Sequence, residues 1–258
     1  MLDAAMPIEI PPHLLSAARV VASRRDMLHR LPRNCAFVEV GVGIGVFTHE
    51  VMTICAPRSF VAIDDFGLDR VELLWGRPSA EVFEGWGHQG FYEHRFEREI
   101  GTGLVTVIRS GSAAGIAALP DDSVDVIYVD ADHTYDAVRA DLQACLPKVK
   151  SSGRIIVNDY VLTPADASGL RFGVIDATNE FMIAHDFAME YFVLQQDMFC
   201  DVVITRSANI NRAGFNQTDE HAAAVRRGLE RRIAELERSS SWRITAPLRR
   251  ASRLLRRR

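Results

Sequence analysis

Polar side chains that could hold a metal ion or move a proton follow two predicted strands, Val124–Val129 and Arg154–Val157. They are Asp130, Asp132, His133, Asn158 and Asp159. Ligands of an open α/β sheet bind beyond the carboxyl ends of its strands, so we expect these side chains to face one site. Carboxylate and amide oxygens suit Mg²⁺, which makes Asp132, Asn158 and Asp159 predicted metal ligands. The ion would lower the pKa of a coordinated hydroxyl and fix its oxygen for attack.

A glycine loop supplies the second set of candidate residues. The apolar run Cys35–Val40 predicts a buried strand, and a helical pattern covers Val46–Ile54. Between them lie Gly41, Gly43 and Gly45. Glycines let the backbone approach a ligand closely, and the start of a helix presents free N–H groups. Strand, loop and helix together predict a nucleotide site.

The spacing of this loop distinguishes between nucleotides. Dinucleotide sites favour G-x-G-x-x-G, whereas this loop reads G-x-G-x-G and has Val46 at the later position. Glu39 precedes the first glycine by two residues, and its carboxylate suits the cationic amino and sulfonium groups of S-adenosylmethionine better than a pyrophosphate. Asp64 follows the predicted strand Ser59–Ile63 and could accept hydrogen bonds from both ribose hydroxyls. The strand-end position favours Asp64 over the neighbouring Asp65.

The loop resembles the first motif of the class I S-adenosylmethionine-dependent methyltransferases, which has the form acidic-x-G-x-G-x-G. The matching residues are Glu39, Gly41, Gly43 and Gly45. The resemblance implies that these residues bind the cofactor. It also implies that Ser112, in the loop after the predicted strand Leu104–Ile108, lies near the adenine. Asp130 is expected on the cofactor side of the site as well.

A second pattern, D-x-D-H-x-Y followed by N-D-Y, resembles the metal-dependent O-methyltransferases of small molecules. The likeness is greatest to bacterial enzymes that methylate sugars and more distant to catechol O-methyltransferase, and it covers about Asn34–Arg206. It implies Asp132 or His133 as the catalytic base beside the metal ligands. Many such enzymes have two aspartates where this chain has Asn158 and Asp159.

The elements that must position these residues alternate between strand and helix. This alternation predicts an α/β fold with a parallel sheet and helices on both faces. A helix is expected over Pro11–Leu31, ahead of the first strand, and seven strands are counted from Cys35 onward. The last two, Ala188–Leu194 and Phe199–Thr205, are so close that they must pair antiparallel. With the resemblance, this predicts a Rossmann-like, seven-stranded, mostly parallel sheet.

The segment Phe66–Gly103 is too long for an ordinary connection in a compact domain. We interpret it as an inserted lid or substrate segment. Its aromatic and basic residues are given no individual role. They are Trp75, Trp86, His88, Tyr92, His94 and Arg95.

Composition limits the class of protein. The 258 residues are 48% hydrophobic and 25% charged, which is ordinary for a globular domain, and residues 1–217 are expected to form it. No apolar run approaches the ~18 residues of a membrane span, and the N-terminus lacks the order of a signal peptide. A cytoplasmic protein is therefore expected. The net charge of −4 hides an acidic body, which makes nucleic acid an unfavourable substrate.

Residues 218–258 form a predicted basic appendage. Thr218–Arg238 has apolar residues at helical spacing, a seam that could pair with a second copy. Ser239–Arg258 combines seven arginines with apolar side chains, which is typical of segments that lie on an anionic membrane surface. It resembles the tails of bacterial glycosyltransferases and methyltransferases of surface-glycan assembly. A disordered solubilising tail is the alternative.

Two functions of different class fit these observations. The first is an S-adenosylmethionine-dependent O-methyltransferase with a sugar, glycan or other small-molecule acceptor, assisted by Mg²⁺ and found in the cytoplasm or at the inner membrane face. The second is a binding or scaffold module that holds S-adenosylmethionine without catalysis. Methyl transfer to any acceptor would separate them.

Overall fold

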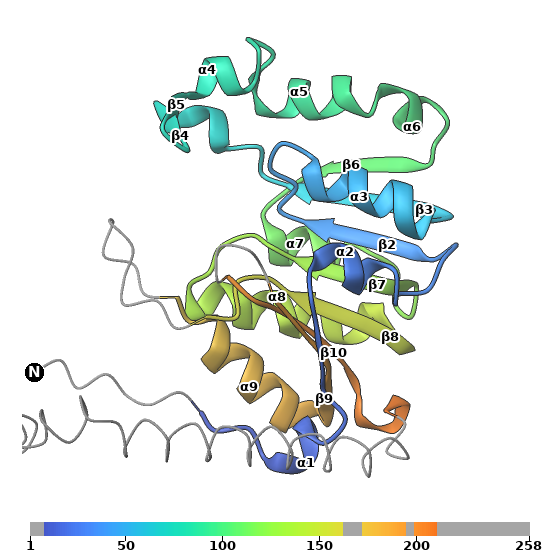
Figure 1. Cartoon of the computed structure of the whole chain (residues 1–258). Coiled ribbons are helices and arrows are strands. Elements are labelled where there is room, and N and C mark those ends of the chain that lie inside the picture. Colours follow the sequence, from blue (N-terminus) through green and yellow to red (C-terminus); the bar gives the residue numbers. More distant parts are fainter. Residues whose placement is uncertain (1–7, 162–171, 195–198, 211–258) are drawn as a thin grey trace, which may run out of the picture. The chain divides into compact units, whose positions relative to one another are not determined.

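The computed structural model describes residues 8–161, 172–194 and 199–210 (Figure 1). The chain divides into two units, Met1–Asn211 and Arg212–Arg258, and all described residues belong to the first. The predicted appendage, residues 218–258, therefore lies outside the described residues. Among the described helices, none has the length and apolar character of a membrane span.

An eight-stranded sheet of order β1-β9-β10-β8-β7-β2-β3-β6 forms the centre of the first unit. Its strands are β1 (Arg19–Val21), β2 (Ala36–Val40), β3 (Ser59–Asp64), β6 (Val105–Arg109), β7 (Val124–Val129), β8 (Val149–Val157), β9 (Phe187–Val193) and β10 (Asp201–Arg206). The α-helices are α1 (Pro12–Leu15), α2 (Arg24–Leu28), α3 (Val46–Cys55), α4 (Ser79–Val82), α5 (Gly87–Arg95), α6 (Glu97–Gly101), α7 (Ser112–Ala117), α8 (Tyr135–Lys148) and α9 (Val174–His185).

The strand directions confirm a Rossmann-like α/β fold. Neighbouring strands pair in parallel except for β10, which lies between β8 and β9 and runs antiparallel to both. The predicted hairpin at the end of the domain is thus β9 and β10. The sequence-based assignment of one antiparallel strand in a parallel sheet is confirmed.

The sheet has eight strands rather than the predicted seven. All seven strands counted from Cys35 onward are present, and the eighth is β1, which pairs in parallel with β9. It lies within Pro11–Leu31, where we expected a single helix, so that expectation is wrong. The segment divides because Val20 and Val21 are β-branched and favour a strand, and because Ser23 caps a new helix by accepting a hydrogen bond from the backbone N–H of Asp26.

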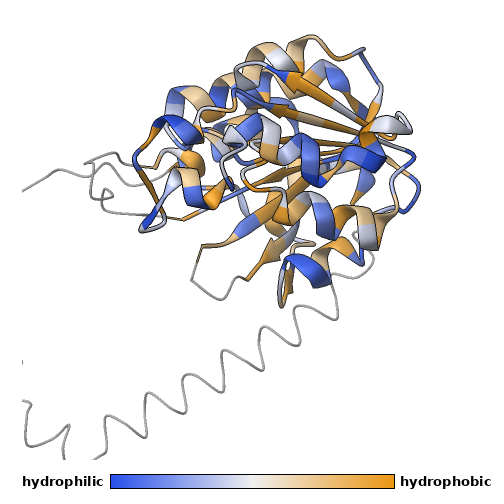
Figure 2. Ribbon diagram, turned by 90° about the horizontal axis from the view of Figure 1, so that it is seen from above, coloured by the Kyte–Doolittle hydropathy of each residue, from blue (hydrophilic) through white to orange (hydrophobic). Residues whose placement is uncertain are grey.

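Side chains alternate between two apolar cores along the central strands. On β2, Phe37 packs on the side of α2 and α3, whereas Val38 and Val40 pack on the side of α7, α8 and α9. Figure 2 shows hydrophobic residues along the strands and hydrophilic residues on the outer helical turns. Because both faces are covered, the polar ends of the strands are where a ligand can approach the sheet.

The inserted segment after β3 has more structure than its sequence suggested. It contains a short 3-10 helix, η1 (Leu68–Arg70), a small antiparallel pair of β4 (Leu73–Leu74) and β5 (Arg77–Pro78), and the helices α4, α5 and α6. Figure 1 shows these helices grouped beside the edge of the sheet that β6 forms. Two boundaries also differ from expectation. Pro147 predicts the end of a helix over Tyr135–Leu146, but α8 continues to Lys148. The strand predicted over Arg154–Val157 begins earlier, because β8 starts at Val149.

Candidate functional site

A cavity of about 1240 Å³ opens at the carboxyl ends of β2, β3, β6 and β7. Eight of the residues predicted from the sequence line it. They are Glu39, Gly41, Gly43, Asp64, Ser112, Asp130, Asp132 and His133. Gly45, Asn158 and Asp159 are not among its lining residues. The topology therefore brings most of the predicted cofactor residues into one space, which is larger than a typical pocket for a single small molecule.

The glycine loop is built to leave space for a ligand. Gly41 has φ +82°, and a Cβ there would lie 1.8 Å from the carbonyl oxygen of Asp130, so only glycine fits. Gly43 has φ +49°, and a Cβ there would have no atom within 4 Å. Gly45 instead packs against the ring of Phe96. The packing of the fold therefore requires glycine at position 41, whereas Gly43 borders open space.

Helix α5 of the insert holds the backbone of this loop. The ring atom Nε2 of His88 lies 2.8 Å from the carbonyl oxygen of Gly43, and Arg95 Nη1 donates to the carbonyl oxygen of Ile44 at 2.6 Å. His88 is fully buried. Sequence reasoning gave neither residue a role, because only the fold shows that the insert packs on the loop.

Glu39 is a buried carboxylate at the wall of the cavity. It is 1% exposed, and its Oε2 accepts a hydrogen bond from the Thr48 hydroxyl at 2.6 Å. Burial raises the pKa of Glu39 well above its usual range, and the hydroxyl of Thr48 opposes this rise. A cation in the cavity would favour the ionised form of this side chain.

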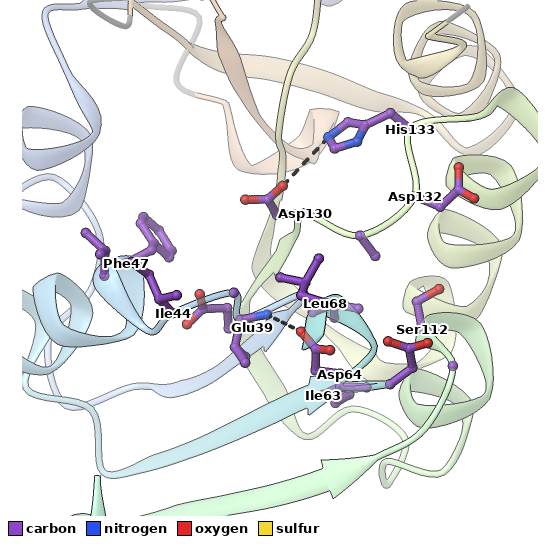
Figure 3. A pocket seen from close by; sticks show the side chains of 18 of the residues that line it. Glu39, Ile44, Phe47, Ile63, Asp64, Leu68, Ser112, Asp130, Asp132 and His133 are labelled. Carbon is purple, nitrogen blue, oxygen red and sulfur yellow. Dashed lines mark hydrogen bonds and ion pairs between the residues drawn. The ribbon is translucent and has the colours of Figure 1, made fainter. Parts of the chain in front are cut away.

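Asp64 connects β3 to the glycine loop. Its Oδ2 accepts a hydrogen bond from the N–H of Val42 at 2.8 Å (Figure 3). Its Oδ1 accepts one from the N–H of Phe66 at 2.6 Å. Each carboxylate oxygen has two lone pairs, so both can still accept hydrogen bonds from a ligand. Asp65 also lines the cavity, but its side chain is 62% exposed. Ser112, the first residue of α7, also lines the cavity.

His133 lies at the centre of a cluster of hydrogen-bond acceptors. Its Nε2 is 3.0 Å from Asn158 Oδ1, 3.5 Å from Asp159 Oδ2 and 3.7 Å from Asp130 Oδ1. Burial raises the pKa of Asp130 and that of Asp159, and His133 opposes the rise in both. Phe172 stacks on the His133 ring with a centroid separation of 4.7 Å.

Asp132 does not join this cluster. Its Oδ1 accepts a hydrogen bond from the N–H of Thr134 at 2.7 Å, just before α8. In Figure 3 the Asp130 carboxylate is directed toward the His133 ring, while the Asp132 carboxylate lies on the other side of the loop. Asp130, rather than Asp132, is therefore the strand-end carboxylate beside His133.

The predicted metal ligands are not arranged as an open ligand set. Asn158 is 3% exposed, and its amide is already hydrogen-bonded at both ends. Over residues 8–161, 172–194 and 199–210, no group of three or more His, Cys, Asp or Glu side chains is placed to hold a metal ion. The predicted Mg²⁺ site thus finds no support in the described residues.

Several residues of the cavity were missed in the sequence. They are Arg24, Phe47, Trp75 and Phe172. Arg24 reaches the site because β1 pairs with β9, an arrangement with no local signal in the sequence. Trp75 belongs to the aromatic insert, whose composition suggested a substrate segment without identifying a residue.

Residues 38–160 match a methyltransferase domain. The matched range extends from within β2 through the glycine loop to Tyr160, so it contains most of the residues that line the cavity. The match to a methyltransferase domain supports an enzyme of this kind. No curated protein sequence matches the chain.

Three solved structures illustrate the similarity of this chain to known proteins. The pyocyanin biosynthetic protein PhzM is 15% identical, with a TM-score of 0.46 over 69% of this chain and 54% of that one. The O-methyltransferase NcsB1 from neocarzinostatin biosynthesis is 16% identical, with a TM-score of 0.43 over 67% of this chain and 49% of that one. An S-adenosylmethionine-dependent methyltransferase from Aquifex aeolicus is 13% identical, with a TM-score of 0.46 over 75% and 93%. This chain spans about half the length of the first two.

Proposed function

We propose that this protein is an S-adenosylmethionine-dependent O-methyltransferase that acts on a hydroxyl of a sugar, glycan or other small molecule. One observation carries the proposal: the carboxylates of Glu39, Asp64 and Asp130 line a cavity bordered by an open glycine loop. Glu39 is buried, and a buried carboxylate is costly unless a partner compensates its charge. A ligand with positive charge and ribose hydroxyls would provide such partners.

The residues fit this cofactor group by group. Glu39 and Asp130 would face its amino and sulfonium groups, Asp64 would accept from the ribose hydroxyls, and Ser112 would lie near the adenine. The open space at Gly43 would hold the part of the cofactor that lies against the backbone of the glycine loop. When bound, S-adenosylmethionine would supply a methyl group whose carbon an oxygen nucleophile can attack, with the neutral thioether S-adenosylhomocysteine as the leaving group.

His133 is the proposed proton acceptor for the attacking hydroxyl. It lines the cavity with its side chain 21% exposed, so an acceptor can reach it. Asp130 and Asp159 lie within 4 Å of its Nε2 and stabilise the positive charge that the ring gains when it takes the proton. No step in this scheme requires a metal ion.

Assistance by Mg²⁺ was predicted from the sequence and would need a different arrangement of the same residues. Asn158 would have to release His133, and Asp132 would have to turn from the N–H of Thr134. We therefore expect methyl transfer to continue when divalent ions are chelated. Loss of activity in chelator and recovery with Mg²⁺ would show that the site rearranges around a metal.

Transfer of isotope from methyl-labelled S-adenosylmethionine tests the function. The purified protein is incubated with a panel of sugars, nucleotide sugars, glycans and catechols, with and without chelator, beside a His133→Gln variant. We expect labelled product from at least one class and a rate at least about 100-fold lower in the variant. If S-adenosylmethionine binds but no acceptor is labelled, the result favours the alternative hypothesis, that the protein is a binding module without catalysis.

A further inference from the structure

A chain of hydrogen bonds leads from His133 into the protein interior. His133 Nε2 lies 3.0 Å from Asn158 Oδ1, and the Asn158 amide nitrogen donates to the Tyr128 hydroxyl and to Asp201 Oδ1, both at 3.0 Å. Arg24 in turn donates to both oxygens of Asp201, from Nε at 2.8 Å and from Nη2 at 3.3 Å. Tyr128, Asn158 and Asp201 are all buried. Residues from four different elements or loops thus meet behind one ring.

The ion pair at the interior end sets the direction of each donor. The Asp201 carboxylate, paired with the Arg24 guanidinium, accepts hydrogen bonds. The group that Asn158 turns toward it must therefore be the NH₂, and the amide oxygen must face His133. An amide oxygen carries no hydrogen, so the proton of this contact belongs to His133 Nε2.

The other neighbours of Nε2 agree with this assignment. Asp159 Oδ2 at 3.5 Å and Asp130 Oδ1 at 3.7 Å also present acceptors to the same nitrogen. Within the described ranges, Nδ1 of His133 has no hydrogen-bond partner. The stacked ring of Phe172 restricts rotation of the imidazole out of this arrangement.

We propose that Arg24, Asp201 and Asn158 are positioning residues that hold neutral His133 as its Nε2–H tautomer and leave Nδ1 as the nitrogen that takes the acceptor proton. The role of Nδ1 rests on the proposed function, while the tautomer rests on the hydrogen-bond chain alone. Asn158, which the sequence suggested as a metal ligand, thus acts through His133.

Nitrogen NMR of protein labelled with ¹⁵N-histidine tests this directly, because it distinguishes a protonated from an unprotonated ring nitrogen. Spectra are recorded at a pH where the ring is neutral, and His133→Gln identifies the signals of this residue among the eight histidines. We expect Nε2 protonated and Nδ1 unprotonated in the wild type. In Asp201→Asn the new amide can donate to Asn158, so the Asn158 amide can turn over and the Nδ1–H tautomer should gain population.

Two further variants make the result decisive. Asn158→Ala removes the hydrogen-bond acceptor of His133 and should also mix the two tautomers. Asn179→Ala is the control: it removes an equally buried amide that is hydrogen-bonded to Tyr160 and Ile8, and it should leave the tautomers of His133 unchanged. Titrating the same samples with S-adenosylmethionine tests the proposed function separately. Because Asn158 does not line the cavity, we expect the dissociation constant for S-adenosylmethionine to change less than about 3-fold in Asn158→Ala. A wild-type spectrum with Nδ1 protonated, or unchanged tautomers in both Asp201→Asn and Asn158→Ala, would overturn the proposal.

Discussion

At the scale of single residues, the protein keeps carboxylates in places where ionisation is unfavourable. Glu39 and Asp130 border the cavity, where a ligand can compensate the cost. Asp141 on α8 is different, since it is fully buried, lines no part of the cavity, and neither of its carboxylate oxygens has a hydrogen-bond partner in the described structure. Ionisation of Asp141 therefore lowers the free energy of unfolding.

The stability of the protein should therefore depend on the protonation of Asp141. Burial raises the pKa of Asp141 from 3.8 to about 6, and the charge of Asp132 adds to the rise. A carboxyl group whose pKa is raised on folding destabilises the folded state as pH rises from about 4 to about 6, and the loss persists above that range. Asp141→Asn should thus raise the free energy of unfolding at pH 7.5 by up to roughly 3 kcal/mol and leave it nearly unchanged at pH 4. Urea unfolding at both pH values measures this, and an equal change at both would contradict it.

Residue roles were readable from the sequence where they depend on local spacing. The glycines and Glu39 follow from their position between a strand and a helix, and all but Gly45 line the cavity. The choice between Asp130 and Asp132 was not readable, because it depends on which way the loop before α8 turns. Asn158 could not be assigned either, since its partner Asp201 comes from β10 and is remote in sequence.

At the scale of elements, the insert supports the glycine loop rather than forming only a lid. Helix α5 places His88 and Arg95 on two successive carbonyls of the loop, Gly43 and Ile44. The loop conformation that borders the cavity is thus fixed from outside the sheet. The aromatic composition of the insert indicated a functional segment, but a contact across 45 or more residues leaves no periodic signal in the sequence.

Removing one of these contacts should weaken cofactor binding without unfolding the domain. Arg95→Ala loses a hydrogen bond from a charged donor, which contributes roughly 1.5–3 kcal/mol in buried settings and less here because Arg95 is exposed. We expect the dissociation constant for S-adenosylmethionine to rise about 3- to 10-fold. Arg98→Ala, an exposed arginine on the next helix, is the matched control. Equal affinity for S-adenosylmethionine in both variants would show that the contact from the insert does not affect cofactor binding.

The elements themselves were predicted well where one hydrophobic period covered the whole element. The strands β2, β3, β6, β7, β9 and β10 and the helix α3 appear near their expected ranges, whereas β4 and β5 were not expected. Pro11–Leu31 failed because its apolar residues belong to three short elements whose spacing imitates one helix. A strand of three residues such as β1 is stable only because β9 is beside it.

At the scale of the whole molecule, the charge separates into an acidic domain and a basic appendage. Residues 219–258 carry twelve arginines and five acidic side chains, against a net charge of −4 for the chain. We propose that Ser239–Arg258 brings the enzyme to an anionic membrane surface where glycan acceptors are assembled. Each basic residue near such a surface contributes about 1 kcal/mol, screened by salt.

Deletion after Arg238 tests this role of the appendage. The full chain should sediment with anionic liposomes at low salt and be released at high salt, whereas the truncated chain should stay in the supernatant. Affinity for S-adenosylmethionine should be unchanged, because the cavity lies in the first unit. Equal sedimentation of both forms would exclude the membrane role.

The central claim, that the cavity at the glycine loop binds S-adenosylmethionine, is tested most directly by calorimetric titration of the wild type and a Gly43→Val variant. Gly43 and Gly103 both have positive φ and open space around a Cβ, but only Gly43 lines the cavity, so Gly103→Val controls for backbone strain. We predict binding to the wild type and to Gly103→Val, and at least about 100-fold weaker binding to Gly43→Val, because a side chain there would occupy the space of the ligand. No binding to the wild type, or equal affinity in Gly43→Val, would contradict the claim.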